Sequence, residues 1–68
     1  MVNANVRAAI EDMGVKQKFI AEKTGISEAA LSAMLNEKQK ISADDFFAIA
    51  YVLRIQPEAL YNYKVEAS

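Results

Sequence analysis

Apolar residues recur along most of the chain at the three- and four-residue spacing of a helix that buries one face. The first run shows the pattern clearly and consists of Val6, Ala9, Ile10 and Met13. Because these residues stand at i, i+3, i+4 and i+7, they lie on one side of a helix. Alternating β-branched residues bounded by tight-turn pairs, which would indicate strands, are missing. The pattern predicts an all-α domain.

Five helices with short connections are expected from these runs and from the residues at their ends. Asn3 or Asn5 is expected to cap the first helix, and Gly14 is expected to end it in a left-handed conformation. The second helix is expected to begin near Lys16 and to end before Gly25, which accepts a positive φ without strain.

The later helices also begin at residues that favour a helix start. Ser27 is expected to cap a third helix, and Asn36 to end it, because Asn tolerates the left-handed conformation better than most residues. The sequence SADD, residues 42–45, resembles a capping box, and its two acids favour the positive end of the helix dipole. Pro57 is expected to open a fifth helix. The inward positions expected on the third and fourth helices are Ala30, Leu31, Met34, Leu35, Phe46, Ile49, Ala50 and Leu53.

The turn at Gly25 is short enough to hold two helices against each other. Gly25 permits a chain reversal within three or four residues, and Ala21 is small where a second helix must cross closely. Ile26 is then expected to enter the core. This is the arrangement of a helix-turn-helix, although any corner between two helices can use glycine in the same way. The turn alone leaves both interpretations open.

The wider sequence resembles the Cro/repressor type of helix-turn-helix domain over about residues 6–60. The resemblance rests on VKQKFIAEKTGISEAALSAMLNEK and ISADDFFAIAYVLRIQPEAL in this order and spacing. It implies a compact five-helix, lambda-repressor-like domain over residues 1–62, followed by a short tail over residues 63–68. The positions that match the family pattern are Gln17, Ile20, Ala21, Gly25, Ser27, Asn36, Lys38, Ile49, Ala50, Leu53, Ile55 and Leu60.

Two positions depart from the family pattern. Glu37 and Arg54 stand where the family usually has glycine. If the backbone is left-handed there, each costs on the order of 1 kcal/mol of stability. Glu37 would also place a negative charge near the DNA phosphates.

By resemblance, the third helix would lie in the major groove of double-stranded DNA. Glu28 could accept a hydrogen bond from cytosine N4, or it could be only a charge that favours the helix N-terminus. No Arg, Asn or Gln stands on this face to make a bidentate contact with a base. The residues expected to face the bases are Ser27, Glu28, Ala29, Ser32 and Ala33.

More residues are available to contact the DNA backbone than to contact the bases. Gln17 matches the family position that bonds phosphate, and the lysines are either phosphate contacts or solvated surface charges. The residues expected to contact phosphate are Arg7, Lys16, Gln17, Lys18, Asn36, Lys38 and Lys40.

A single half-site with so few base contacts would bind weakly, which favours a homodimer. Apolar surface is available in the C-terminal third of the chain, and it either forms the dimer interface or packs back on the monomer. The residues expected at the interface are Phe47, Tyr51, Tyr61 and Tyr63.

Composition excludes several kinds of chemistry. The chain has 68 residues and no cysteine or histidine, so disulfides, thiolate metal sites and the commonest general base are all excluded. We therefore expect no enzyme, no metal, no cofactor and no small-molecule ligand. The longest apolar run, residues 46–53, is far below the roughly 20 residues that cross a bilayer. A cytoplasmic location, in a bacterial or phage-infected cell, is expected.

Two functions remain open at this point. The resemblance implies a sequence-specific transcriptional regulator, of the phage or prophage repressor type, that binds an inverted repeat as a dimer. The alternative is a protein-interaction module on the same scaffold, antirepressor or antitoxin-like. The net charge of −1, the alanine-rich third helix, Glu28 and Glu37 favour this alternative. Salt separates the two, because DNA binding weakens steeply as salt rises and an apolar interface does not.

Overall fold

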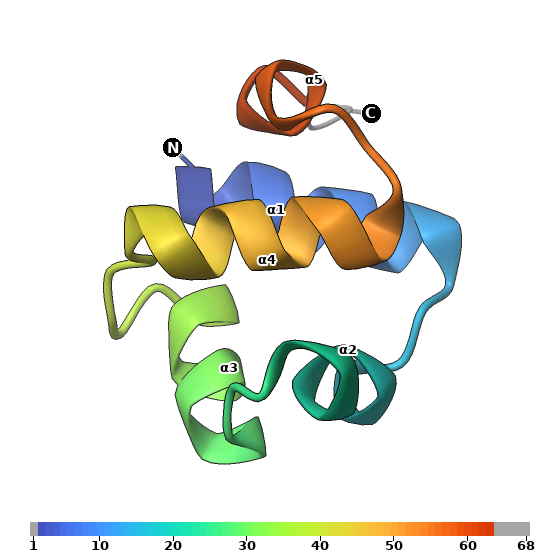
Figure 1. Ribbon diagram of the computed structural model, residues 1–68. Coiled ribbons are helices and arrows are strands. Elements are labelled where there is room, and N and C mark those ends of the chain that lie inside the picture. Colours follow the sequence, from blue (N-terminus) through green and yellow to red (C-terminus); the bar gives the residue numbers. More distant parts are fainter. Residues whose placement is uncertain (1, 64–68) are drawn as a thin grey trace.

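Five α-helices make up the part of the chain that the computed structural model describes, residues 2–63. They are α1 (Val2–Met13), α2 (Gln17–Thr24), α3 (Glu28–Leu35), α4 (Ala43–Leu53) and α5 (Pro57–Tyr61). In Figure 1, α2 and α3 lie on one side of α4 and α5 lies on the other. Over these residues the chain forms helices and no strand, which confirms the predicted all-α class. Residues 64–68, most of the expected tail, lie outside the described residues.

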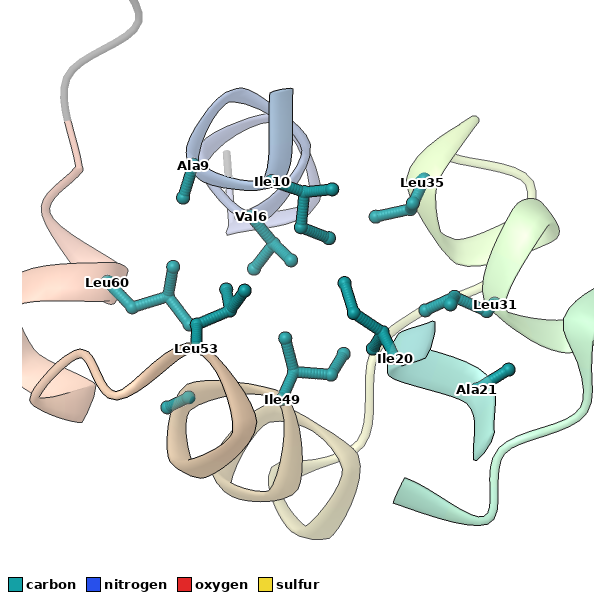
Figure 2. Close-up of a cluster of buried hydrophobic side chains, with 11 residues drawn as sticks. Val6, Ala9, Ile10, Ile20, Ala21, Leu31, Leu35, Ile49, Leu53 and Leu60 are labelled. Carbon is teal, nitrogen blue, oxygen red and sulfur yellow. The ribbon is translucent and has the colours of Figure 1, made fainter. Parts of the chain in front are cut away.

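A single hydrophobic core joins the five helices. Figure 2 shows side chains from every helix converging on a common centre. None of the helices is long and apolar enough to cross a membrane within the region described. The core cluster consists of Val6, Ala9, Ile10, Ile20, Ala21, Leu31, Leu35, Ile49, Ala50, Leu53 and Leu60.

The inward face predicted for each helix is largely confirmed. Met34 is buried beside the core, and Phe46 packs against it while half-buried. Met13 is the exception, because 47% of its surface is exposed. It stands in the last turn of α1, where Val15 just beyond the helix covers the core in its place.

The caps predicted from serine and glycine are confirmed. The Oγ of Ser27 accepts a hydrogen bond from the Ala30 N–H at 3.1 Å, and the Oγ of Ser42 accepts one from the Asp45 N–H at 3.1 Å. Gly14 has a φ of 69°, and its left-handed conformation ends α1. These bonds fix where α3 and α4 begin, because each satisfies one of the free N–H groups of the first turn.

The cap predicted at the start of α1 is wrong. The helix already includes Val2, which packs against the core, so Asn3 and Asn5 lie within the helix instead of before it. Their side-chain amides donate to distant carbonyls. Nδ2 of Asn3 donates to the carbonyl of Met34 in α3 and to that of Gln39 in the α3–α4 loop. Nδ2 of Asn5 donates to the carbonyl of Tyr61 in α5.

The end of α3 also differs from the expectation. Asn36 terminates the helix but has a φ of −94°, and Glu37 takes the left-handed conformation with a φ of 61°. The reason lies in the bonds that close the helix, since the Lys38 N–H donates to the carbonyl of Ala33 and the Glu37 N–H to that of Met34. This pair of bonds is a Schellman motif, which requires a left-handed residue directly after the cap.

Arg54 ends α4 in the same way. Its φ is 58°, and the Ile55 N–H donates to the carbonyl of Ala50 while the Arg54 N–H donates to that of Tyr51. At the end of α1 the Val15 N–H donates to the carbonyl of Ile10 and the Gly14 N–H to that of Glu11, which is the same motif. Ile55 and Val15 each follow their motif and pack against the core. Two of the three Schellman ends therefore use a charged residue at a position that favours glycine.

We expect Arg54→Gly to raise the free energy of unfolding by about 1 kcal/mol relative to Arg54→Ala, because both remove the side chain and only glycine removes the left-handed strain. Urea denaturation of both variants measures this difference. Gly14→Ala is the converse control and is expected to lower stability, since the added Cβ would meet no atom beyond the adjoining backbone within 4 Å and only the φ is unfavourable. Equal stabilities of the two Arg54 variants would contradict the strain.

Candidate nucleic-acid interface

The turn between α2 and α3 is held by a small set of local hydrogen bonds. The Gly25 N–H donates to the carbonyl of Ala21 at 2.9 Å, with Gly25 at a φ of 82°. The Thr24 hydroxyl donates to the carbonyl of Ile20 at 2.7 Å and accepts from the Ile26 N–H at 3.2 Å. These bonds fix the direction in which α3 leaves the turn.

Thr24 is a residue that the sequence interpretation missed. Its hydroxyl bonds back to a carbonyl four residues earlier, which is a known behaviour of Ser and Thr in helices. A threonine directly before the turn glycine was the available signal. The bond to Ile26 could not be predicted, because it depends on how the chain leaves the turn.

The five predicted base-facing residues lie together on the open side of α3. Ser27, Glu28 and Ala29 are exposed, and Ser32 and Ala33 are half-buried. Positions 28, 29, 32 and 33 share one face of the helix. The opposite face is buried and consists of Leu31, Met34 and Leu35.

Both serines on this face already accept a hydrogen bond. Ser27 caps α3, and the Oγ of Ser32 accepts from Nδ2 of Asn36 at 3.3 Å. A hydroxyl has one hydrogen to donate and two lone pairs. Each serine therefore still offers its hydrogen to an acceptor such as a base edge or a phosphate. Glu28 offers only acceptor oxygens, so the face combines two hydroxyl donors with one carboxylate.

Exposed polar residues form two groups, one at the start of α2 and one after α3. Lys16, Gln17 and Lys18 are exposed at the start of α2. Lys16 precedes the helix, and its side chain accepts no hydrogen bond from the first N–H groups of α2. Backbone N–H groups at a helix start and nearby cations can bind phosphate oxygens together.

The second group lies after α3. Asn36, Lys38 and Lys40 are exposed there, and Arg7 of α1 reaches this end of α3, with its Nη1 3.5 Å from Oδ1 of Asn36. Arg7 is paired with Glu11 through an Nε–Oε2 distance of 3.2 Å. That pair is exposed and therefore weak, so Arg7 can exchange it for a phosphate. Among residues 2–63, no hydrogen bond or ion pair joins this group to the one at α2.

A fixed turn, an open helix face and polar residues on both flanks are the parts of a DNA-binding helix-turn-helix. Comparison with known families agrees, since the Cro/C1-type HTH DNA-binding domain matches residues 5–66. The chain belongs to this family. Comparison with curated proteins and with solved structures gives no significant match.

The Cro/C1-type match confirms the resemblance and the five-helix fold, and it makes double-stranded DNA the partner class. Members of this family are typically not enzymes. Within residues 2–63, no group of three or more acidic, histidine or cysteine side chains could hold a metal ion. The match does not test single residues, so the base, phosphate and interface assignments stay predictions.

An aromatic patch is exposed on α4 and α5. Phe47, Tyr51 and Tyr61 are exposed over 55%, 84% and 57% of their surfaces. The ring of Phe46 packs edge-on against Phe47 and Tyr61, with centroid separations of 5.8 Å and 6.4 Å. The patch therefore joins α4 to α5. A groove of about 380 Å³ adjoins it, lined by Phe47, Ala50, Tyr51, Arg54, Ile55, Gln56 and Pro57.

Tyr63 differs from the other three residues predicted for an interface. It is half-buried against the core, and its hydroxyl donates to Oδ2 of Asp12 at 2.6 Å. This bond raises the pKa of Tyr63, because it forms only while the phenol keeps its proton. Tyr63 thus contacts its own chain.

The sequence interpretation also missed Phe19. Its surface is 46% exposed, the ammonium of Lys23 lies 5.6 Å from its ring centre, and it shares a shallow groove with Tyr51 and Arg54. Phe19 precedes the buried Ile20, and adjacent helical positions face in different directions. That spacing was the signal for its exposure.

Glu37 is the acid closest in sequence to the predicted phosphate contacts. In a Cro/C1-type domain we expect Glu37→Gln to tighten DNA binding by roughly 5-fold at low salt, since one unit charge about 4 Å from another in water is worth about 1 kcal/mol. The gain should shrink as salt rises. Fluorescence anisotropy with a labelled duplex measures both effects.

Glu58→Gln is the matched control for Glu37→Gln, because it removes an exposed acid from α5. The control is expected to leave the affinity almost unchanged. Equal effects of the two substitutions would mean that the loop after α3 does not face the DNA backbone.

Proposed function

We propose that this chain is a phage- or prophage-type transcriptional repressor that binds an inverted repeat in double-stranded DNA as a dimer, with α3 in the major groove. The observation that carries the proposal is the α2–α3 unit itself. Its turn is fixed by hydrogen bonds through Thr24 and Gly25. The outer face of α3 is open, and exposed polar residues stand at the start of α2 and in the loop after α3.

In this proposal, most of the affinity comes from the DNA backbone. Lys16, Gln17 and Lys18 contact phosphates on one side of the groove, and Lys38 and Lys40 contact those on the other. Phosphate contacts fix the register of the protein and make binding dependent on salt, but they carry no sequence information. Arg7 and Asn36 also contact phosphates on the second side, after Arg7 has exchanged its pairing with Glu11 for a phosphate.

Sequence preference then rests on a small set of side chains. Glu28 accepts from a cytosine amino group, Ser27 and Ser32 donate to base acceptors, and Ala29 and Ala33 contact thymine methyl groups. None of these makes a bidentate pair with a purine. Each half-site is therefore weakly specific, and the shape of the DNA contributes to the choice of operator.

Dimerisation brings two weak half-sites together. Phe47, Tyr51 and Tyr61 offer an exposed aromatic surface that can face its own symmetry copy. The Cα atoms of the domain extend over 31 × 24 × 22 Å. Two such domains in contact can place their recognition helices roughly 34 Å apart, which is one turn of DNA.

A protein-interaction module, antirepressor or antitoxin-like, is the second candidate. The chain is slightly acidic, and Glu28 and Glu37 are exposed on and just after α3. The grooves around Tyr51 would also suit an apolar partner. In that case binding would depend on apolar area and would respond little to salt.

Selection of bound duplexes from a random pool, at about 50 and about 200 mM salt, tests the proposal. We expect enrichment of an inverted repeat whose half-site centres are roughly 10 base pairs apart, with binding that weakens steeply between the two salts. Enrichment of a single, unrepeated site would argue against the dimer. No enrichment at either salt would contradict a DNA-binding role and favour the protein-interaction module.

Two substitutions test the division between phosphate and base contacts. Gln17→Ala is expected to weaken binding to all sequences by a similar factor, because it removes a backbone contact. Glu28→Ala is expected to change the preferred base at one position of each half-site, worth about 1–3 kcal/mol of discrimination. Repeating the duplex selection with each variant measures both effects. An unchanged preference for Glu28→Ala would leave that residue as a helix-end charge only.

A further inference from the structure

One side chain of α1 spans the turn that follows α3. Nδ2 of Asn3 donates to the carbonyl of Met34 at 2.7 Å and to that of Gln39 at 2.9 Å. A side-chain amide has two hydrogens to donate, so the two bonds use its full capacity. The two acceptors lie 31 and 36 residues further along the chain. A single residue near the start of the chain thus holds both sides of the loop that contains Glu37 and Lys38.

This loop has few other constraints. Its first residues bond back to α3 through the Schellman motif, which ends at Lys38. Beyond that point, the bond from Asn3 to Gln39 is the one hydrogen bond within residues 2–63 that reaches the loop backbone before Ser42. The remaining anchor is Ile41, which packs against the core.

We propose that Asn3 is a positioning residue for the DNA-backbone contacts of this loop. The inference rests on the proposed function, because it assigns a purpose to the exposed residues Lys38 and Lys40. Asn3 ties the loop to the last turn of α3, so that the loop cations keep a fixed place relative to the helix that enters the groove. Without the amide, the charges remain but their backbone moves, and each phosphate contact must first order the loop.

The structure supplies a matched residue for comparison. Asn5 is two positions further along α1, and its Nδ2 donates to the carbonyl of Tyr61 at 2.8 Å. It ties α1 to the end of α5, which lies on the other side of α4 from α3 (Figure 1). A purely structural role would make the two asparagines equivalent, whereas a positioning role sets Asn3 apart.

The test compares Asn3→Ala with Asn5→Ala in the full chain. Each substitution removes one amide and places a better helix former in α1. The first readout is the ¹⁵N relaxation of the Lys38 and Gln39 amides in the free protein. The second is the affinity for a mixed-sequence duplex as a function of salt, with the oligomeric state of each variant followed by sedimentation.

We expect Asn3→Ala to increase the fast motion of the Lys38 and Gln39 amides and to weaken binding by about 10-fold. The salt slope should become shallower by about 1 per bound chain, the share of roughly one phosphate. Asn5→Ala should leave the loop and the slope as they are in the wild type. Asn3→Gln retains both amide hydrogens and should recover part of the affinity.

Each other outcome overturns a distinct statement. Unchanged relaxation at Lys38 in Asn3→Ala would show that the bonds do not hold the loop, whatever happens with DNA. A mobile loop with wild-type affinity and slope would overturn the positioning role while leaving the proposed function intact. Equal losses of DNA affinity for Asn3→Ala and Asn5→Ala would mean that both residues only stabilise the fold. If the wild type binds no duplex, the proposed function fails and the positioning role fails with it.

Discussion

The burial of one face of α3 is the constraint on which the rest of the structure depends. This helix has only eight residues, and isolated helices shorter than about 12–15 residues are marginal in water. Leu31, Met34 and Leu35 must therefore be covered by other helices before α3 exists at all. Figure 2 shows how the cover is built, with Ile20 of α2 and Ile10 of α1 directed toward the same centre. The outer face carries only small or polar side chains, because Leu31, Met34 and Leu35 all stand on the inner face.

The polar side chains of α1 hold the surrounding elements at its two flanks. Asn3 and Arg7 contact the end of α3 and the loop that follows it. Asn5 donates to the end of α5, and Asp12 accepts a hydrogen bond from the Tyr63 hydroxyl. None of these bonds is deeply buried, so each contributes modestly to stability. They chiefly fix orientation, because hydrophobic burial is non-directional and does not by itself set how a short loop or the last helix lies on the core.

The sequence predicted the local structure well, because local structure depends on neighbours in the chain. Ser27 and Ser42 cap the next helices, and Gly14 and Gly25 are left-handed, all through contacts within a few residues. Asn3 was misassigned for the opposite reason. An asparagine near a helix start has the same sequence pattern whether it caps that helix or bonds a carbonyl 31 residues away.

The candidate site was predicted less completely than the local structure. The open face of α3 followed from the positions left over by its buried stripe. The resemblance pointed to Lys16, Gln17 and Lys18, which are exposed. What could not be predicted was the bond from Arg7 to Asn36. This bond links α1 to the end of α3, so it depends on how the core packs.

The net charge of −1 is a poor guide to whether such a domain can bind DNA. The Debye length is about 8–10 Å at physiological salt, whereas the Cα atoms of the domain extend over 31 × 24 × 22 Å. Acids on α5 are therefore largely screened from a duplex at α3. The balance that matters is local, and it sets five cations (Arg7, Lys16, Lys18, Lys38 and Lys40) against three acids (Glu11, Glu28 and Glu37). Arg7 and Glu11 pair with each other in the free protein. Four lysines then remain against Glu28 and Glu37, so the proposed interface is locally positive even though the whole chain is slightly acidic.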